Sequence, residues 1–177
     1  MIIAISGLTG SGKNTIGALL SKKLKYKMIC PTFKDLAKKE GIDLMEFHMM
    51  AKNDHSIDRK FDEMLRQQAK GNCIVTTWLG PWIVDADVRI KVYAPLNIRA
   101  ERTAKRDGMK IDEATNHILK RDKINKERYM KVYGISIDED SIFDACLNSG
   151  FYTPEELLKI VLVILKTRDK NGSNRRR

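Results

Sequence analysis

The sequence has no apolar run long enough to form a helix that crosses a membrane. Such a helix needs about 20 consecutive apolar residues, whereas the longest candidate, residues 157–165, is about half that length. The first residues show no secretory signal pattern. Cysteine is scarce, because only Cys30, Cys73 and Cys146 occur and no two have C-x-x-C spacing. This scarcity favours buried thiols in a reducing cytosol over disulfides or a metal site. We therefore expect a cytoplasmic protein.

Internal repeats and low-complexity linkers are missing before residue 166, and the three histidines have no ligand partner at a useful spacing. The chain has 177 residues, of which 42% are hydrophobic. This length and composition predict a single folded domain, which we place at residues 1–165.

The net charge of +10 raises the question of nucleic acid binding. Residues 166–177 contain six basic side chains and one acid, which is half of the excess. We interpret this segment as a disordered basic tail, and a frayed solubilising end is favoured over weak RNA contact. Residues 98–131 hold the other concentration of positive charge.

An apolar run at residues 2–5 leads directly into a glycine-rich stretch that ends in lysine. Gly7, Gly12 and Lys13 match the P-loop pattern G-x-x-x-x-G-K-[ST]. Glycines allow tight turns that bring backbone N–H groups onto phosphate oxygens, and a following helix adds its positive dipole end. The lysine reaches the β- and γ-phosphates. The predicted nucleotide-binding residues are Gly7, Gly10, Ser11, Gly12, Lys13, Asn14 and Thr15, and Lys13 is also predicted to be catalytic.

One position departs from the P-loop pattern. Asn14 stands where serine or threonine offers a hydroxyl to Mg²⁺. Thr15 follows at once, and we assign it as the metal-binding residue, either in a shifted register or through water. A glycine-rich turn without a ligand is the alternative, but three glycines and a lysine at these spacings rarely serve packing alone.

Apolar segments of strand length alternate with helical patterns along the chain. The expected strands are residues 2–6, 27–30, 73–77, 88–93 and 142–147, and the expected helices after the P-loop helix are residues 33–39, 44–51, 57–70, 97–106, 112–130 and a last one opened by Thr153, Pro154 and Glu156. This alternation predicts an α/β protein, the P-loop NTPase three-layer fold with a five-stranded parallel sheet. Ligands should bind at the carboxyl ends of the strands.

Two helical inserts, residues 33–70 and 97–130, suit a small kinase with two substrates, one flap closing over the acceptor and one over the nucleotide. Arg121 and Arg128 lie on one helix face. Phosphoryl transfer requires neutralisation of charge on the transferring group, and arginine forks suit that task. We predict Arg102, Arg121 and Arg128 as lid arginines with a catalytic role. The alternative is a solvated charged helix whose side chains pair locally.

Several stretches together resemble the nucleoside monophosphate kinases, most closely the archaeal-type cytidylate kinases. The resemblance covers about residues 2–165, and the tyrosine–glycine stretch after the second insert is its most specific part. The matching stretches are residues 3–15, 33–37, 57–62, Trp82, 94–96, 99–102, 105–108, 121–122, 128–129, 133–135, 141–144 and 152–156.

The resemblance implies ATP-dependent phosphorylation of CMP and dCMP with Mg²⁺, and an acceptor site at the first insert and the end of the third strand. This sequence departs there. Lys34 replaces an arginine after a shortened loop, and Thr76-Thr77-Trp78 stands where the family shows Glu-Gly-Arg. Lysine cannot reproduce the bidentate fork of arginine.

The predicted substrate-binding residues are Lys34, Asp58 and Trp78. Trp78 either stacks on a nucleobase or packs between the sheet and a helix. Asp58, with Asp62 one turn away, either orders the acceptor base or has a capping or surface role.

We therefore expect a cytidylate kinase-like phosphotransferase, most simply a monomer, whose partners are ATP and a nucleoside monophosphate. One rival is a kinase of another acceptor, such as AMP. The other is a nucleotide-binding protein with weak catalysis that contacts RNA only through the basic tail.

Overall fold

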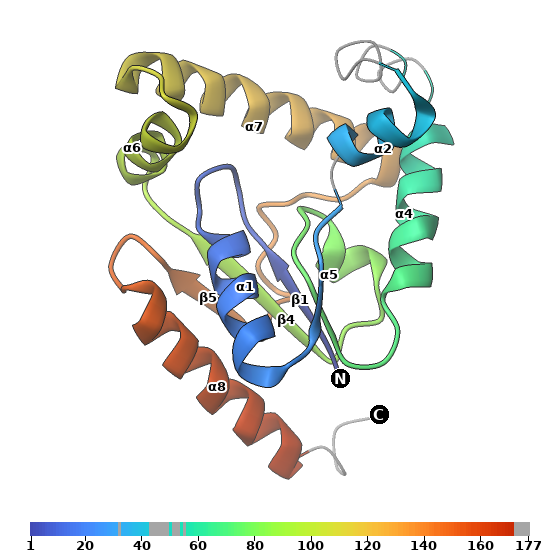
Figure 1. Cartoon of the computed structure of the whole chain (residues 1–177), viewed down its shortest axis with the longest axis vertical. Helices are drawn as coiled ribbons and strands as arrows, with labels where there is room; N and C mark the ends of the chain where they lie inside the picture. Colours follow the sequence, from blue (N-terminus) through green and yellow to red (C-terminus); the bar gives the residue numbers. More distant parts are fainter. Residues whose placement is uncertain (32, 43–49, 51–53, 55, 172–177) are drawn as a thin grey trace.

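The computed structural model describes residues 1–31, 33–42, 50, 54 and 56–171, with only the backbone at residues 33–35, 39 and 169–171. Its centre is a sheet of five parallel strands in the order β2-β3-β1-β4-β5 (Figure 1). The strands are β1 (Ile2–Ser6), β2 (Lys27–Ile29), β3 (Cys73–Val75), β4 (Val88–Tyr93) and β5 (Ala145–Asn148). The predicted five-stranded parallel sheet is thus confirmed.

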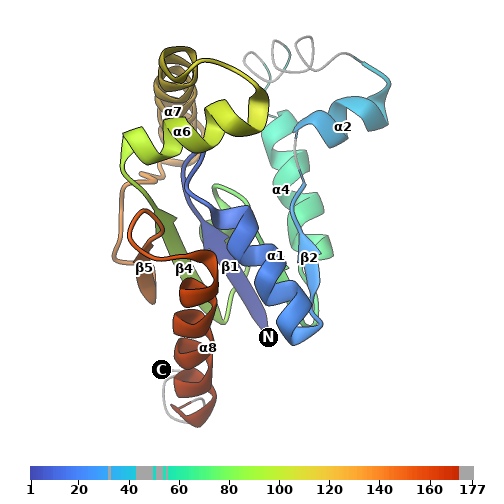
Figure 2. The ribbon, with the colours of Figure 1, turned by 60° about the vertical axis from the view of Figure 1, so that its left-hand side comes forward.

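Helices cover both faces of the sheet, as a three-layer fold requires. On one face, α1 (Lys13–Leu24) and α8 (Pro154–Asn171) pack against β1 and β4 around fully buried isoleucine, leucine and valine side chains. On the other, α4 (Ser56–Gln68) and the short α5 (Gly80–Ile83) pack over β3. Figure 2 shows the helices of the two faces on opposite sides of the sheet. These strands are apolar on both sides because helices bury both of their faces.

The remaining helices lie at the carboxyl end of the strands. They are α2 (Phe33–Glu40), α6 (Leu96–Asp107) and α7 (Ile111–Tyr133), and α7 extends across this end of the sheet (Figure 1). Gly108 and Gly134 end α6 and α7 with positive φ angles of 66° and 67°, a conformation that glycine adopts without penalty. Both inserts therefore stand beside the loop that joins β1 to α1.

Three strands differ from their predicted bounds. The second ends at Ile29 rather than at residue 30. The third ends at Val75, although the Thr76 N–H still donates to Ile29 O at 2.9 Å, so the chain leaves the sheet before Thr77. The fifth begins at Ala145 rather than at residue 142. Phe143 instead packs edge-on against Trp82, with ring centroids 5.3 Å apart. The Asp144 carboxylate accepts the Arg89 N–H at 2.8 Å, and the Asp144 N–H donates to Arg89 O at 2.8 Å, so contact with β4 begins at Asp144, one residue before the strand.

The predicted disordered tail is wrong for residues 166–171, because α8 continues to Asn171. Arg168 forms an ion pair with Asp144, which ties this last stretch of the helix to the sheet edge. The beginning of α8 is as predicted, since Thr153 and Glu156 exchange capping hydrogen bonds. The predicted helix at residues 44–51 lies outside the described residues except for residue 50. Within the described part of the chain, no helix is long and apolar enough to cross a membrane.

Candidate functional site

The loop between β1 and α1 forms a cradle of backbone N–H groups. Gly10 and Gly12 adopt positive φ angles of 77° and 90°, and Gly12 begins α1 without a side-chain cap. The loop is closed by the Ser11 N–H, which donates to Leu8 O at 3.1 Å. The first N–H groups of a helix have no partner within the helix, and the helix dipole favours an anion there. The geometry is therefore that of a phosphate-binding P-loop.

Lys13 is the first residue of α1 and lies among other cations. Burial lowers the pKa of Lys13 to about 8; the Cys30 thiol opposes this shift, while Arg121 and Arg106 add to it. Arg106 of α6 and Arg121 of α7 thus make the surroundings of Lys13 more positive. Positive groups near one another repel, and a bound polyanion such as a nucleoside triphosphate relieves this repulsion.

Arg102 is connected to the P-loop through Ser149. Its guanidinium donates to Ser149 Oγ at 2.8 Å and to Ser149 O at 2.6 Å, and Ser149 Oγ donates in turn to Ser11 O at 2.6 Å. Ser149 belongs to the turn after β5, so this turn is fixed against the P-loop. A hollow of about 100 Å³ lies at this junction. It is lined by Gly12, Thr15, Ile16, Arg102, Ser149, Tyr152, Pro154 and Leu157.

A buried ion pair connects the P-loop to both lid helices. Arg99 of α6 donates from Nη1 to Asp122 Oδ2 of α7 at 2.6 Å and to Thr9 O of the P-loop at 3.2 Å. Both charged side chains are only 9% exposed. Gly10 packs directly on the Arg99 backbone, since a Cβ at Gly10 would lie 2.7 Å from Arg99 O. Arg121 is the neighbour of Asp122 in the sequence. The Arg99–Asp122 ion pair therefore fixes the part of α7 that carries Arg121.

The other end of α7 contacts α4. Arg128 forms a bidentate ion pair with Asp58, donating from Nε to Oδ2 at 3.0 Å and from Nη2 to Oδ1. One turn along α4, the Asp62 carboxylate accepts a hydrogen bond from the Tyr133 hydroxyl. Burial raises the pKa of Asp62 to about 6 despite this hydrogen bond, and burial also raises the pKa of Tyr133. Arg128 therefore turns toward the acceptor insert.

Trp78 lies under α7. Its ring is 6.2 Å from that of Tyr129 at an interplanar angle of 60°, and its carbonyl accepts a hydrogen bond from Ser6 Oγ at 2.6 Å. The ring is partly buried and belongs to the apolar cluster on the α4 side of the sheet. In this structure Trp78 thus packs between the sheet and a helix, which was the alternative to a base-binding role. Stacking of Trp78 on a nucleobase stays a prediction. The Lys34 side chain lies outside the described part of the chain.

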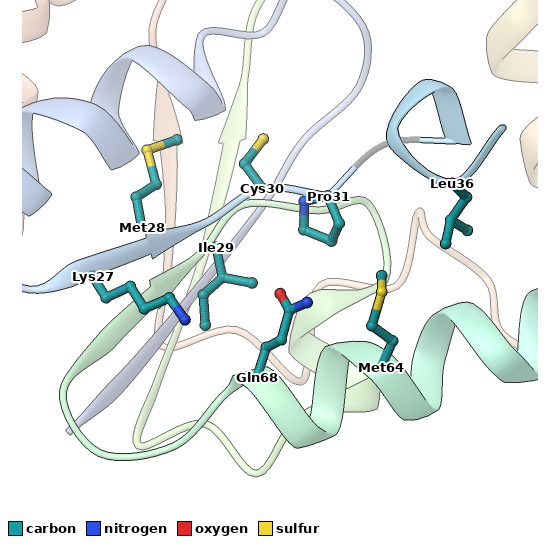
Figure 3. Close-up of a pocket in the computed structure, with 8 residues that line it drawn as sticks. All are labelled: Lys27, Met28, Ile29, Cys30, Pro31, Leu36, Met64 and Gln68. Atoms are coloured by element: carbon teal, nitrogen blue, oxygen red, sulfur yellow. The ribbon is translucent and has the colours of Figure 1, made fainter. Parts of the chain in front are cut away.

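A larger hollow of about 380 Å³ opens between edge strand β2 and α4 (Figure 3). Met64 and Gln68 extend from α4 toward the strand, and Cys30 and Pro31 follow the strand toward the acceptor insert. The lining is mostly apolar and comprises Lys27, Met28, Ile29, Cys30, Pro31, Leu36, Met64 and Gln68.

The described residues contain no cluster of three or more histidine, cysteine, aspartate or glutamate side chains that could hold a metal ion. Asn14 and Thr15 are both exposed at the start of α1, and Thr15 lines the hollow beside Arg102. Their amide and hydroxyl oxygens are ligands suited to Mg²⁺, which usually keeps most of its coordination for water and substrate phosphates. The assignment of Thr15 as the metal-binding residue stays a prediction.

The sequence identified the P-loop, Arg102, Arg121, Arg128 and Asp58, and the structure places all of them around the carboxyl end of the sheet. It brings Arg128 and Asp58 into direct contact, which their separation of 70 residues gave no reason to expect. Ser149 and the partnership of Arg99 with Asp122 were missed. The one signal for Arg99 in the sequence is the helical period of 3.6 residues, which places it on the same face of α6 as the buried residues.

Known cytidylate kinases are similar to this chain over most of its length. A model of the cytidylate kinase-like family matches residues 2–150. The cytidylate kinase of Sulfolobus acidocaldarius is 37% identical and the match covers 98% of both chains. The cytidylate kinase of Pyrobaculum calidifontis is 38% identical over 94% of both chains. In Pyrococcus horikoshii, the cytidylate kinase is 36% identical over 97% of this chain and 92% of its own.

Solved structures support the fold. An uncharacterized protein from Eubacterium ventriosum superposes with a TM-score of 0.72 at 16% identity, covering 95% of this chain and 99% of its own. The shikimate kinase of Acinetobacter baumannii superposes with a TM-score of 0.60 at 13% identity, covering 94% of this chain and 93% of its own. At these identities the likeness concerns the fold alone.

Proposed function

Because the chain belongs to the cytidylate kinase-like family, we propose that it transfers the γ-phosphoryl group of ATP to CMP or dCMP. The observation that carries this proposal is the P-loop at the start of α1, where Gly10 and Gly12 adopt positive φ angles and Arg99 of the lid helix α6 donates to Thr9 O. Phosphoryl transfer needs little covalent chemistry from a protein, and its catalysis rests on positioning and on neutralising charge.

The P-loop N–H groups and Lys13 would bind the β- and γ-phosphates. Arg121 would approach the γ-phosphoryl group from α7 and neutralise charge as the bond to the leaving oxygen breaks. Mg²⁺ would enter with the nucleotide, near Asn14 and Thr15, and would neutralise phosphate charge and align the oxygens. The hollow beside Arg102 and Tyr152, at the α1 end of the loop, suits the nucleoside part of ATP. Covering the phosphates with α6 and α7 would exclude water and limit hydrolysis.

The acceptor would bind between the first insert and the end of β3, where Asp58 and Trp78 lie. A specific observation favours another acceptor as second candidate. The described residues after β3 are Thr76, Thr77 and Trp78, without the arginine of the family pattern, and the ring of Trp78 packs against Tyr129. AMP, another nucleotide or a non-nucleotide alcohol is therefore the alternative acceptor.

The test is transfer of labelled γ-phosphate from ATP with Mg²⁺ to CMP, dCMP, UMP, AMP and GMP, beside a control without acceptor. CMP or dCMP as the best acceptor supports the proposal. A different best acceptor favours the second candidate, and nucleotide binding without any transfer contradicts both.

Variants at α1 test the assigned role of Lys13. Lys13→Ala should abolish transfer, because it removes the charge that neutralises the β- and γ-phosphates. The matched control is Lys22→Ala, which removes an exposed lysine from the last turn of the same helix and should leave transfer unchanged. Intact transfer in Lys13→Ala would refute the assignment.

A further inference from the structure

Two side-chain contacts join the acceptor insert to the lid helix. Asp58 and Asp62 lie one turn apart on α4, and their partners Arg128 and Tyr133 lie at the carboxyl end of α7. Both aspartate residues are only 5% exposed as a whole. We call these four residues the α4–α7 clasp. It connects segments about 70 residues apart in the chain, so it fixes how the two inserts stand relative to each other.

The Asp58–Arg128 contact is too well made to be an incidental surface pair. The Arg128 side chain is 16% exposed and that of Asp58 is 6% exposed. The carboxylate takes two hydrogen bonds from one edge of the guanidinium, from Nε and from Nη2. A bidentate pair of this kind fixes both the place and the plane of the arginine. A lone arginine on an exposed helix face would have neither restraint.

The surroundings of Arg128 explain why its orientation matters. Its neighbour in sequence, Tyr129, packs on Trp78 directly after β3, close to the P-loop end of β1, where Ser6 Oγ donates to the Trp78 carbonyl. Arg121, two turns earlier on α7, is close enough to Lys13 to lower its pKa. The guanidinium of Arg128 is therefore held on the acceptor side of the same helix whose donor side faces the P-loop.

From this geometry we propose that Asp58 is a positioning residue that aims Arg128 at the acceptor side of the phosphoryl-transfer site, rather than a residue that contacts the acceptor itself. The inference rests on the proposed kinase function. Asp62 and Tyr133 support it by anchoring the next turn of the two helices. Because the residues directly after β3, Thr76, Thr77 and Trp78, carry no positive charge, an acceptor phosphate on this side of the site depends on a correctly held Arg128.

A double-mutant cycle separates the two roles of Asp58. Asp58→Asn, Arg128→Ala and the double variant are compared with the wild type in steady-state transfer to the best acceptor. If Asp58 acts through Arg128, Asp58→Asn lowers kcat by about tenfold to a hundredfold, because a small misplacement of a catalytic group has that effect. In the Arg128→Ala background the same change then has less than about a threefold effect.

Two further variants complete the cycle. Asp58→Glu keeps a carboxylate within reach of Arg128 and should recover most of the kcat that Asp58→Asn loses. Glu63→Gln is the matched control on the same helix, since Glu63 is exposed and pairs with Arg66 at 3.7 Å; its kcat should equal that of the wild type. An equal loss on Asp58→Asn with and without Arg128 would overturn the proposal.

Fluorescence tests the clasp independently of activity. In a Trp82→Phe background, Trp78 is the only tryptophan, and its ring contacts Tyr129 beside Arg128. Loosening α7 should expose Trp78, so Asp58→Asn should shift its emission to longer wavelength and increase its quenching by acrylamide, while Glu63→Gln should change neither. An unchanged emission in Asp58→Asn refutes the positioning role. Failure of the wild type to phosphorylate any acceptor refutes the kinase function instead, and the two outcomes are distinguishable.

Discussion

Removal of one partner from the Arg99–Asp122 pair should strongly destabilise the protein. The two side chains are 9% exposed and their charged atoms are 2.6 Å apart. Asp122→Ala leaves the Arg99 charge buried with only the Thr9 carbonyl as described hydrogen-bond partner. Loss of one partner of a buried pair typically lowers the free energy of unfolding by about 3–5 kcal/mol. For a chain of this size, the melting temperature should then fall by about 10 °C.

Replacement of both partners should be far less harmful. Arg99→Met together with Asp122→Leu leaves no buried charge, and well-packed apolar replacements of buried pairs are often neutral or stabilising. The double variant should therefore unfold close to the wild type, at a higher urea concentration than either single variant. Its ATP affinity should nevertheless fall, because Arg99 no longer donates to Thr9 O in the P-loop.

The assay is urea unfolding at pH 7, followed by circular dichroism. Glu127→Ala is the control, because the Lys123–Glu127 pair on α7 spans 3.9 Å with side chains 78% and 65% exposed; exposed pairs contribute less than about 1 kcal/mol. The reasoning is refuted if Asp122→Ala stays within about 1 kcal/mol of the wild type, or if the double variant loses the sum of the single losses.

Because burial lowers the pKa of Lys13 to about 8 and ATP binds its charged form, ATP affinity measured by calorimetry should fall as the pH rises through that value; an Arg106→Gln variant should move this fall to higher pH. In the folded state the pKa of Asp62 is raised to about 6 from 3.8. Between about pH 4 and pH 6 the folded state therefore holds a proton that the unfolded state has lost, so the free energy of unfolding should fall as the pH rises through this range. Asp62→Asn should abolish this fall in urea titrations. Gly10→Ala should weaken ATP binding more than Gly71→Ala weakens it, because a Cβ at Gly10 meets Arg99 O at 2.7 Å whereas Gly71, also at positive φ, has nothing within 4 Å; equal affinities would contradict the packing argument.

The sequence was sufficient to predict the fold and the place of the P-loop within it. The P-loop is encoded in nine consecutive residues, and hydrophobic periodicity identifies each strand within a few positions. Residues 142 and 143 lie outside β5, because the Phe143 ring packs against Trp82 and contact with β4 begins at Asp144. The disordered tail was predicted too early, because charge composition alone gives no sign of the ion pair between Arg168 and Asp144.

The acceptor half depends on contacts between distant segments. Helical spacing placed Arg121 and Arg128 on one face of α7, but it could not show that a carboxylate on α4 would hold one of them. Ser149 was missed for the same reason, since its partners Arg102 and Ser11 are 47 and 138 residues away. Arginine and aspartate at such separations pair only once the sheet has brought their helices together.

The position of α7 follows from these distant contacts. Its middle is fixed to the P-loop through Asp122 and Arg99, and its carboxyl end is fixed to α4 through the clasp. A rigid helix of 23 residues held at two points transmits a shift at one end to the other. Since a coupling between two binding sites is reciprocal, an acceptor that engages Arg128 should tighten ATP binding by the same factor by which ATP tightens acceptor binding. Asp58→Asn should reduce this shared factor in calorimetric titrations with a non-hydrolysable ATP analogue, whereas an unchanged factor is incompatible with coupling through α7.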